Sequence, residues 1–268
     1  MTRGQAMSYD TLDIERRGAI ATIWMDRPDV FNAFNEQLIA ELDDACRALD
    51  TDAAVRVVVL GGRGRHFSAG ADLHWMRRAA DSSEQDNLAD SRRFAAMLRR
   101  LANLSKPTIA RVQGAALGGG TGLAAACDMA IAADDASFAT SEARFGIIPA
   151  VISPYVLRAI GPRHALRYFQ SAERFGAAEA KAIGLVGEVV ALDQLDAAVG
   201  RLAQALLACG PQAQFAAKEL IAAIGGRRID DAVGEETATR IARQRATAEA
   251  REGFAAFFEK RPPAWTAT

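Results

Sequence analysis

The sequence of 268 residues predicts an α/β protein in which buried strands alternate with helices. Two observations carry this prediction. Short apolar runs rich in β-branched residues, such as 55–60 (VRVVVL), are typical of strands buried on both faces of a parallel sheet. Glycine-rich turns follow two such runs and lead into helical patterns. Because only helical patterns remain beyond about residue 195, we expect a core over residues 1–194 and a helical region over 195–268.

The chain is predicted to open with a hairpin and a helix. Apolar residues alternate along 12–24, and Arg17 and Gly18 form the turn. Asn35 is placed to cap a helix that runs to about Leu49, because its short polar side chain can accept from the free N–H groups of a first turn.

The middle of the chain continues the alternation of strand and helix. A short helix is expected to end near Arg78, and the polar, mixed-charge segment 77–93 is expected to be a surface loop. A helix through Phe94 follows. Strands are then predicted at 108–112 and 129–133.

The remainder of the chain is predicted to be mostly helical. One last short strand is expected at 187–191. Three helices follow, with the third expected to break near Gly253, and they cover 193–208, 211–224 and 230–258.

Composition excludes several classes of protein. The 32 Lys and Arg balance 33 Asp and Glu, so the net charge of −1 offers no basic surface for nucleic acid. Three scattered cysteines and three histidines favour neither a disulfide framework nor a zinc site. The first ten residues lack an apolar stretch, and the longest uncharged run, 112–127, is too short to span a membrane. We therefore expect a cytoplasmic protein with no membrane or nucleic-acid partner.

Two glycine-rich loops stand where chemistry is most expected. The first ends in Gly70-Ala71-Asp72, and the second, Gly118-Gly119-Gly120, opens a helix of small residues. The N-terminus of a helix offers unpaired N–H donors, and two of them together could hold a negatively charged oxygen. Glycine-rich turns also serve close packing alone, and the pattern does not decide between these readings. Neither loop matches a nucleotide-binding fingerprint.

Several motifs stand in order along nearly the whole chain. They are Phe67-Ser-Ala-Gly-Ala-Asp-Leu73, Val112-Gln-Gly-Ala-Ala-Leu-Gly-Gly-Gly120, Cys127-Asp128, Gly146-Ile-Ile-Pro149 and Glu252-Gly-Phe-Ala-Ala-Phe-Phe-Glu-Lys-Arg261. Together they resemble the crotonase (enoyl-CoA hydratase/isomerase) superfamily. The resemblance implies a crotonase (ClpP-like) spiral of ββα units with two stacked sheets. It also implies a C-terminal helical region that assembles homotrimers or hexamers (dimers of trimers).

The same resemblance implies an acyl-CoA thioester substrate and no separate cofactor, because coenzyme A enters as part of the substrate. It places the thioester oxygen between the backbone N–H groups of Ala71 and Gly119. The further residues that it implies in substrate binding are Arg27 and Val30 on the pantetheine path, Ala69, Gly70, Asp72 and Leu73 around the adenine, Gly118, Gly122, and Phe257 and Lys260 in a neighbouring subunit's site. Alternatively, Phe257 is a core residue and Lys260 a solvated helix end. Arg63, Arg65 and His66 form a small basic cluster that could meet the 3′-phosphate, or could simply be solvated.

Carboxylates distinguish the reactions within this superfamily. Typical hydratases have two glutamates, of which the later corresponds to Glu142, whereas the earlier would fall at Gly122. One glutamate can still act first as general base and then as general acid, and we assign this role to Glu142. Without the resemblance, a solvated loop carboxylate would be the simpler reading. Gly122 is expected to leave space for a branched acyl group.

The segment 141–155 resembles a subgroup described as methylglutaconyl-CoA hydratases. Bulkier residues here replace the usual Gly-Gly after Pro149. Arg144 could meet a substrate carboxylate, although an ion pair at the surface or between subunits is the favoured alternative.

Three functions follow from these residues. The first is a hydratase that adds water to a 2-enoyl-CoA. The second is an isomerase that moves a double bond from the 3- to the 2-position with Glu142 as a single proton shuttle. The third is a binding protein that has kept the fold and lost activity, against which the intact Ala71, Gly119 and Glu142 argue.

Overall fold

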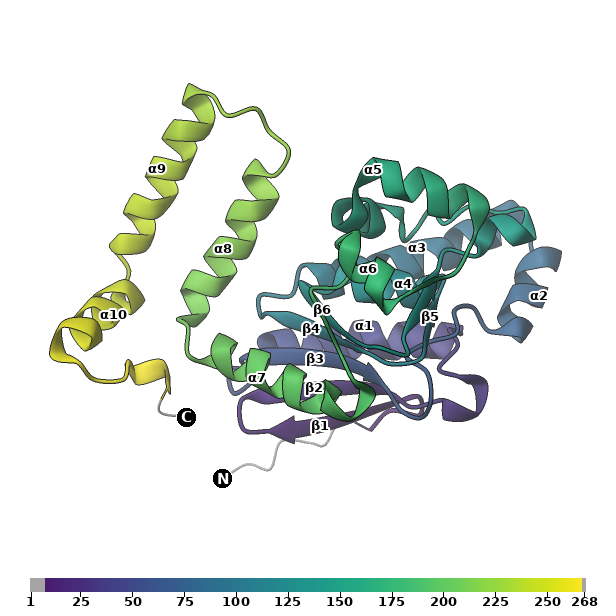
Figure 1. Cartoon of the computed structure of the whole chain (residues 1–268), viewed down its shortest axis with the longest axis horizontal. Helices are drawn as coiled ribbons and strands as arrows, with labels where there is room; N and C mark the ends of the chain where they lie inside the picture. Colours follow the sequence, from purple (N-terminus) through teal and green to yellow (C-terminus); the bar gives the residue numbers. More distant parts are fainter. Residues whose placement is uncertain (1–7, 267–268) are drawn as a thin grey trace.

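A six-stranded sheet lies at the centre of the computed structural model, which describes residues 8–266 (Figure 1). Its strand order is β1-β2-β3-β4-β6-β9, and only the β1–β2 pair is antiparallel. The strands are β1 (Leu12–Arg17), β2 (Ile20–Met25), β3 (Val57–Gly62), β4 (Thr108–Val112), β6 (Met129–Ala133) and β9 (Glu188–Val190). The hairpin and the buried parallel strands predicted from the sequence are confirmed; β3 is buried along its whole length.

A second sheet of three short strands was not identified from residue periodicity. It consists of β5 (Ala115–Leu117), β7 (Ser137–Ala139) and β8 (Phe175–Gly176) in the order β5-β7-β8. Strands of two or three residues are too short to show the alternation by which a strand is recognised. This second sheet matters for function because β5 leads directly into the second glycine-rich loop.

Helices cover both faces of the large sheet. On one face lie α1 (Glu36–Thr51), α3 (Glu84–Ala102) and α4 (Gly119–Ala126), within the larger hydrophobic core. On the other face, α7 (Leu195–Leu207) packs its apolar residues against β3, β4 and β6 in a smaller core. The remaining helices of this part are α2 (Leu73–Asp81), α5 (Ser153–Ser171), α6 (Ala177–Ala182) and the 3-10 turns η1 (Pro28–Val30), η2 (Glu142–Phe145) and η3 (Leu192–Gln194).

Helix boundaries follow the predicted caps in one case and depart from prediction in another. The Asn35 side chain accepts from the Leu38 N–H at 2.9 Å and begins α1, as expected. The predicted surface loop at 77–93 is wrong, because α3 begins at Glu84, where Ser83 accepts from the Asp86 N–H. Its mixed charges form the exposed face of a helix whose other face is buried.

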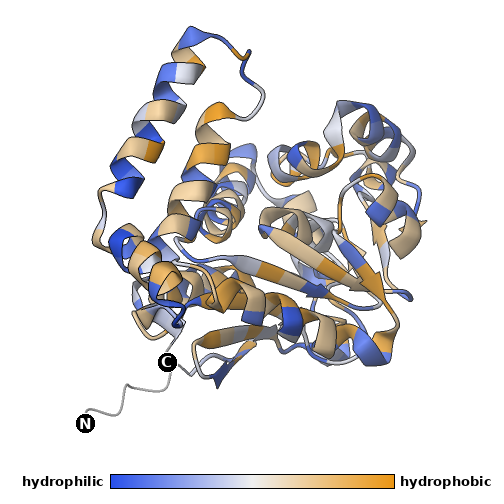
Figure 2. Cartoon of the chain, turned by 60° about the vertical axis from the view of Figure 1, so that its left-hand side comes forward, coloured by the Kyte–Doolittle hydropathy of each residue, from blue (hydrophilic) through white to orange (hydrophobic). Residues whose placement is uncertain are grey.

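The C-terminal helices α8 (Pro211–Ile224), α9 (Asp231–Arg245) and α10 (Ala248–Glu259), with η4 (Ala264–Thr266), project from the sheet as an arm (Figure 1). The arm therefore begins after α7, since α7 shares a core with the sheet. The predicted break near Gly253 is wrong: α9 and α10 meet at residues 246–247, and Thr247 caps α10 by accepting from the Ala250 N–H. Apolar residues recur along the arm (Figure 2). Within residues 8–266, no helix has the length and apolar character that crossing a membrane requires.

Candidate active site

The two glycine-rich loops lie backbone against backbone beside the N-termini of α2 and α4. A Cβ on Gly70 would lie 2.9 Å from the Leu117 carbonyl oxygen, and one on Gly120 would lie 2.7 Å from the Ser68 carbonyl oxygen. Gly70 also has a φ of +92°, which disfavours residues with a side chain. Glycine is therefore required for the approach of the two loops.

Ala71 and Gly119 each present a backbone N–H that has no hydrogen-bond partner in the described part of the chain. The residues on either side of Ala71 are both hydrogen-bonded to Phe34. The Phe34 N–H donates to Gly70 O at 2.7 Å, and the Asp72 N–H donates to Phe34 O at 2.8 Å. Gly119 is the first residue of α4, and the first N–H groups of a helix are free. Both residues line one cleft of about 1120 Å³. The arrangement supplies two donors for an anionic oxygen.

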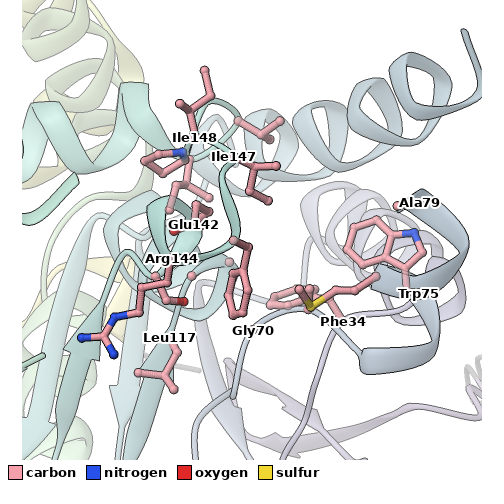
Figure 3. Close-up of a pocket in the computed structure, with 18 of the residues that line it drawn as sticks. Phe34, Gly70, Trp75, Ala79, Leu117, Glu142, Arg144, Ile147 and Ile148 are labelled. Carbon is pink, nitrogen blue, oxygen red and sulfur yellow. The ribbon is translucent and has the colours of Figure 1, made fainter. Parts of the chain in front are cut away.

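Glu142 begins η2 and lines the same cleft (Figure 3). Its Oε2 atom is buried and has no hydrogen-bond partner among residues 8–266. A Cβ on Gly118 would lie 3.2 Å from Glu142 Oε1, so the second glycine loop borders the carboxyl group. Burial raises the pKa of Glu142 above its ordinary value. A buried carboxyl group beside two free amide donors is suited to proton transfer.

The two ends of the cleft differ in chemistry. Phe34 and Trp75 lie to one side of Gly70, whereas the Arg144 side chain extends the other way, away from Glu142 (Figure 3). The large apolar residues of the cleft lining include Phe34, Trp75, Met76, Phe94, Ile148, Val151 and Ile152. The lining cations are Arg144 and Arg174, and neither has an ion-pair partner among the described residues.

Asp72 anchors the first loop from behind. Its buried carboxylate accepts from the His74 N–H at 2.9 Å and from Arg27 Nη2 at 3.1 Å. Burial raises the pKa of Asp72, but the bonds from His74 and Arg27 outweigh it and lower the pKa below its ordinary value. Arg27 and Asp72, predicted to bind substrate, therefore form an internal ion pair that fixes the start of α2.

The structure brings together most of the predicted site residues. Those that line the cleft are Ala69, Gly70, Ala71, Leu73, Gly118, Gly119 and Glu142. Those that do not line it are Arg27, Val30, Asp72, Gly122, Phe257 and Lys260. The last two lie at the end of α10 on the arm, where Phe257 is 77% exposed rather than a core residue.

The space expected beside Gly122 is filled. A Cβ on Gly122 would lie 2.2 Å from Ile152 Cγ2 and 2.7 Å from Ile152 Cβ. Gly122 is itself buried inside α4, and Ile152 forms the cleft wall in its place. The expectation of extra room for a branched acyl group at this position is therefore wrong.

The basic residues predicted near the site have separate environments. Arg63 forms an ion pair with Asp13, whereas Arg65 has none among the described residues. Arg144 donates from Nε to the Ala172 carbonyl at 3.1 Å, and the ion pair expected for it is not formed within residues 8–266. No group of three or more His, Cys, Asp or Glu side chains that could hold a metal ion is found in the same range.

Sequence reasoning missed several residues of the site. Asn32 is fully buried, with Oδ1 accepting from the Arg27 N–H and Nδ2 donating to the Arg63 and His66 carbonyls. Its φ of +54° is a conformation that asparagine tolerates better than most residues, but no periodic pattern marks it. Four apolar residues have the spacing of core residues, and only the assembled fold shows that they line the cleft. They are Phe34, Trp75, Phe94 and Ile152.

Comparison with known proteins gives consistent matches. The family model described as enoyl-CoA hydratase/isomerase matches residues 15–268. The crotonyl-CoA hydratase of Syntrophomonas wolfei is 34% identical over 95% of this chain and 97% of its own length. The hydroxycinnamoyl-CoA hydratase-lyase of Pseudomonas fluorescens is 36% identical over 78% of this chain and 77% of its own. A crystal structure of an enoyl-CoA hydratase from Shewanella pealeana is 42% identical, with a TM-score of 0.92 over 95% of this chain and 96% of that one.

Proposed function

The chain belongs to the enoyl-CoA hydratase/isomerase family, and we propose that it is a hydratase that adds water to a 2-enoyl-CoA thioester. The observation that carries the proposal is a buried carboxyl group, Glu142, in the same cleft as the two free N–H groups of Ala71 and Gly119. A cytoplasmic location, expected from the cysteine content, stays a prediction.

In the proposed reaction, the Ala71 and Gly119 amides hold the thioester oxygen as negative charge develops on it. The Glu142 carboxylate takes a proton from water while the water oxygen bonds to C3, which places the electron pair of the double bond in a thioester enolate. The protonated Glu142 then gives its proton to C2, and the enolate returns to the thioester. One carboxyl group serves both steps, so water adds with syn geometry.

We place the acyl group at the apolar end of the cleft and the CoA phosphates toward the basic end. Neither of the two arginines that line the cleft, Arg144 and Arg174, lies at the apolar end. The charged residue there is Asp90, which accepts from Trp75. A second carboxylate on the acyl group would therefore meet no cation there. We propose a neutral short acyl group, straight or methyl-branched, ahead of the 3-methylglutaconyl group that the segment 141–155 resembles.

A second candidate reaction is the isomerisation of a 3-enoyl-CoA to a 2-enoyl-CoA. The observation that favours it is the filled space at Gly122, because Ile152 lies where a second catalytic carboxyl would be held. Isomerisation needs one group that removes a proton from C2 and returns it to C4.

The test follows the absorbance of the conjugated thioester with crotonyl-CoA, 3-methylcrotonyl-CoA and 3-methylglutaconyl-CoA. We expect loss of absorbance with one of the first two, and a decrease in kcat of about 10²–10⁴-fold in Glu142→Gln. Glu219→Gln, at an exposed residue of α8 whose side chain has no hydrogen bond or ion pair within residues 8–266, is the matched control. No loss with any substrate would overturn the hydratase proposal, and a rise in absorbance with 3-enoyl-CoA would establish the isomerase.

The pH dependence of kcat provides a second test. Glu142 must begin as a carboxylate, and burial raises its pKa. Activity should therefore fall as the pH decreases through a value above the roughly 4.3 of an ordinary glutamate. An acid limb at or below that value, measured over pH 4–8 with a stability control at each pH, would contradict the assigned role.

We also propose that the arm mediates self-association into a homotrimer or hexamer. Phe257 and Phe258 are 77% and 76% exposed on α10, and such apolar exposure is unfavourable in an isolated chain. In the assembly, Phe257 and Lys260 would reach a neighbouring subunit's cleft. Light scattering of the wild type and of Phe258→Ser tests this; a wild type that is monomeric at micromolar concentration would contradict it.

A further inference from the structure

Main-chain hydrogen bonds join the first glycine-rich loop to β5. Phe67 N–H donates to Gln113 O at 2.9 Å, Ser68 N–H to Ala115 O at 3.0 Å, and Leu117 N–H to Ser68 O at 2.9 Å. Ala71 follows three residues after Ser68, and Gly119 follows two residues after Leu117. This short ladder therefore sets the separation of the two free N–H groups.

The imidazole of His66 takes the place of one main-chain acceptor in this ladder. Ala115 N–H donates to His66 Nδ1 at 3.0 Å. In a regular parallel pairing that amide would bond to the carbonyl of His66. The His66 carbonyl instead accepts from Asn32 Nδ2 at 2.8 Å, which leaves the Ala115 N–H without this main-chain acceptor. The ring nitrogen of His66 serves as its acceptor instead.

The ring is held in this position by its neighbours. Phe31 contacts it edge-on, with ring centroids 5.1 Å apart. Gly114 leaves the space that the ring needs, since a Cβ there would lie 2.6 Å from Nδ1 and 2.3 Å from the Arg65 carbonyl oxygen. An N–H can donate only to an unprotonated nitrogen, so the bond specifies a neutral ring with its proton on Nε2.

We propose that His66 is a positioning residue of the oxyanion site, whose neutral imidazole accepts the Ala115 N–H and holds the Ala71 loop against the strand that leads to Gly119. Protonation of the ring converts Nδ1 into a donor and breaks this bond. Turnover then decreases at mildly acidic pH through a group that never touches the substrate. The effect on turnover rests on the proposed function, whereas the hydrogen bond and the tautomer do not.

The charges around the ring oppose its protonation. Arg65 from the same loop and Arg174 from the segment before β8 face it, and Asp135 from the turn between β6 and β7 acts in the opposite sense. Burial, followed by Arg65, lowers the pKa of His66 below its ordinary value. The hydrogen bond from Ala115 to His66 is therefore fully present above the ordinary histidine pKa of about 6.5, and it is lost as the pH falls through the lower pKa of the folded protein.

Two substitutions separate acceptor chemistry from packing. His66→Asn keeps an acceptor, Oδ1, at the same number of bonds from Cα as Nδ1, but it does not titrate. His66→Leu keeps an apolar side chain against Phe31 and has no acceptor. His164→Asn, at an exposed residue of α5, is the matched control.

The first readout is the ¹⁵N spectrum of the labelled histidines in the whole protein. We expect the His66 ring, identified by its absence from the His66 variants, to be neutral with its proton on Nε2 at pH 7.5 and to titrate below the ordinary value of about 6.5. A charged His66 ring at pH 7.5, or a proton on Nδ1, would overturn the proposal whether or not the protein is active.

The second readout is kcat against pH with the best substrate of the panel. His66→Leu should lower kcat about tenfold with KM within threefold, a fraction of the loss seen when an oxyanion donor is removed. His66→Asn should keep kcat at pH 7.5 and retain more of it than the wild type at pH 5.5. Equal kcat in the Asn and Leu variants, or an unchanged acid limb in His66→Asn, would overturn the proposal. A wild type inactive on every thioester would refute the proposed function alone and leave the ¹⁵N result to decide the hydrogen bond.

Discussion

The loops that carry Ala71 and Gly119 present the same chemical group, a free N–H, but are held in different ways. The Ala71 loop is fixed by polar side chains: Asp72 caps α2 and pairs with Arg27, and Asn32 binds the carbonyls before it. The Gly119 loop has one polar anchor, the Thr121 hydroxyl at the Ala116 and Ala139 carbonyls, and otherwise depends on close packing, because a Cβ on Gly120 or Gly122 would overlap its neighbours. The Ala71 loop therefore combines several polar anchors with one close approach at Gly70, whereas the Gly119 loop depends more on close contact.

The two kinds of anchoring predict different responses to substitution. Close packing of backbone against backbone leaves no freedom, so a single methyl group must displace the loop. Polar anchoring is distributed over several bonds, each of which contributes roughly 1 kcal/mol. We therefore expect larger effects from a methyl group added at a close contact such as Gly120 than from the loss of one polar anchor such as Asp72.

The largest effect is expected for Gly120→Ala, which places a methyl group 2.7 Å from the Ser68 carbonyl oxygen. Because Ser68 belongs to the Ala71 loop, the separation of the two N–H donors must change. We expect kcat/KM to fall at least tenfold and the free energy of unfolding to fall by about 1–3 kcal/mol. Gly200→Ala in α7, where a Cβ has no neighbour within 4 Å, should lower neither kcat/KM nor the free energy of unfolding. Equal behaviour of the two variants would remove the basis of the comparison.

An intermediate effect is expected for Gly122→Ala. Its methyl group would overlap Ile152, and overpacking of this kind costs about 1–3 kcal/mol in unfolding experiments. The cost should shrink in an Ile152→Ala background, where the nearest atom is gone. A double-mutant cycle by denaturant unfolding measures this coupling, and additive values would show that the two residues do not compete for space.

The smallest effect is expected for Asp72→Asn in the Ala71 loop. Asparagine keeps the cap through Oδ1 but turns its NH₂ group toward the Arg27 guanidinium, so both the charge and the hydrogen bond to Arg27 are lost and stability at pH 7 should fall by about 1–2 kcal/mol. The hydrogen bonds that lower the pKa of Asp72 give stability that is present above its unfolded pKa and lost as the pH falls through the folded one. The two proteins should therefore converge in acid. Asp81→Asn, at the exposed end of the same helix, should stay within about 0.5 kcal/mol of wild type.

The sequence allowed the large sheet to be predicted more fully than the site. The strand β3 and the helix α1 carry strong local signals, a β-branched run and an asparagine cap, and both were placed within two residues. The loops around Ala71 and Gly119 were recognised because close approach demands glycine. The ion pair of Arg27 and Asp72 was not predicted, since the spacing of these two residues along the chain does not show that they meet.

Gly122 shows why the site could not be completed from sequence. A glycine in place of a side chain was expected to leave a void, but close-packed interiors fill such spaces with a neighbour. That neighbour, Ile152, lies 30 residues later in the chain and comes from the segment before α5. The exposed apolar residues of the arm were anticipated as an assembly surface only through the family resemblance, because isolated periodicity does not distinguish a core face from an interface.

The buried Oε2 of Glu142, without a hydrogen-bond partner among residues 8–266, has a consequence for isotope labelling. Among these residues no protein group is hydrogen-bonded to that oxygen, so none is placed to take the proton from it before the substrate does. Under the proposed reaction, the hydrogen delivered to C2 then originates from the same water molecule whose oxygen becomes bonded to C3. In each product molecule, the oxygen on C3 and the hydrogen added to C2 would come from the same water molecule.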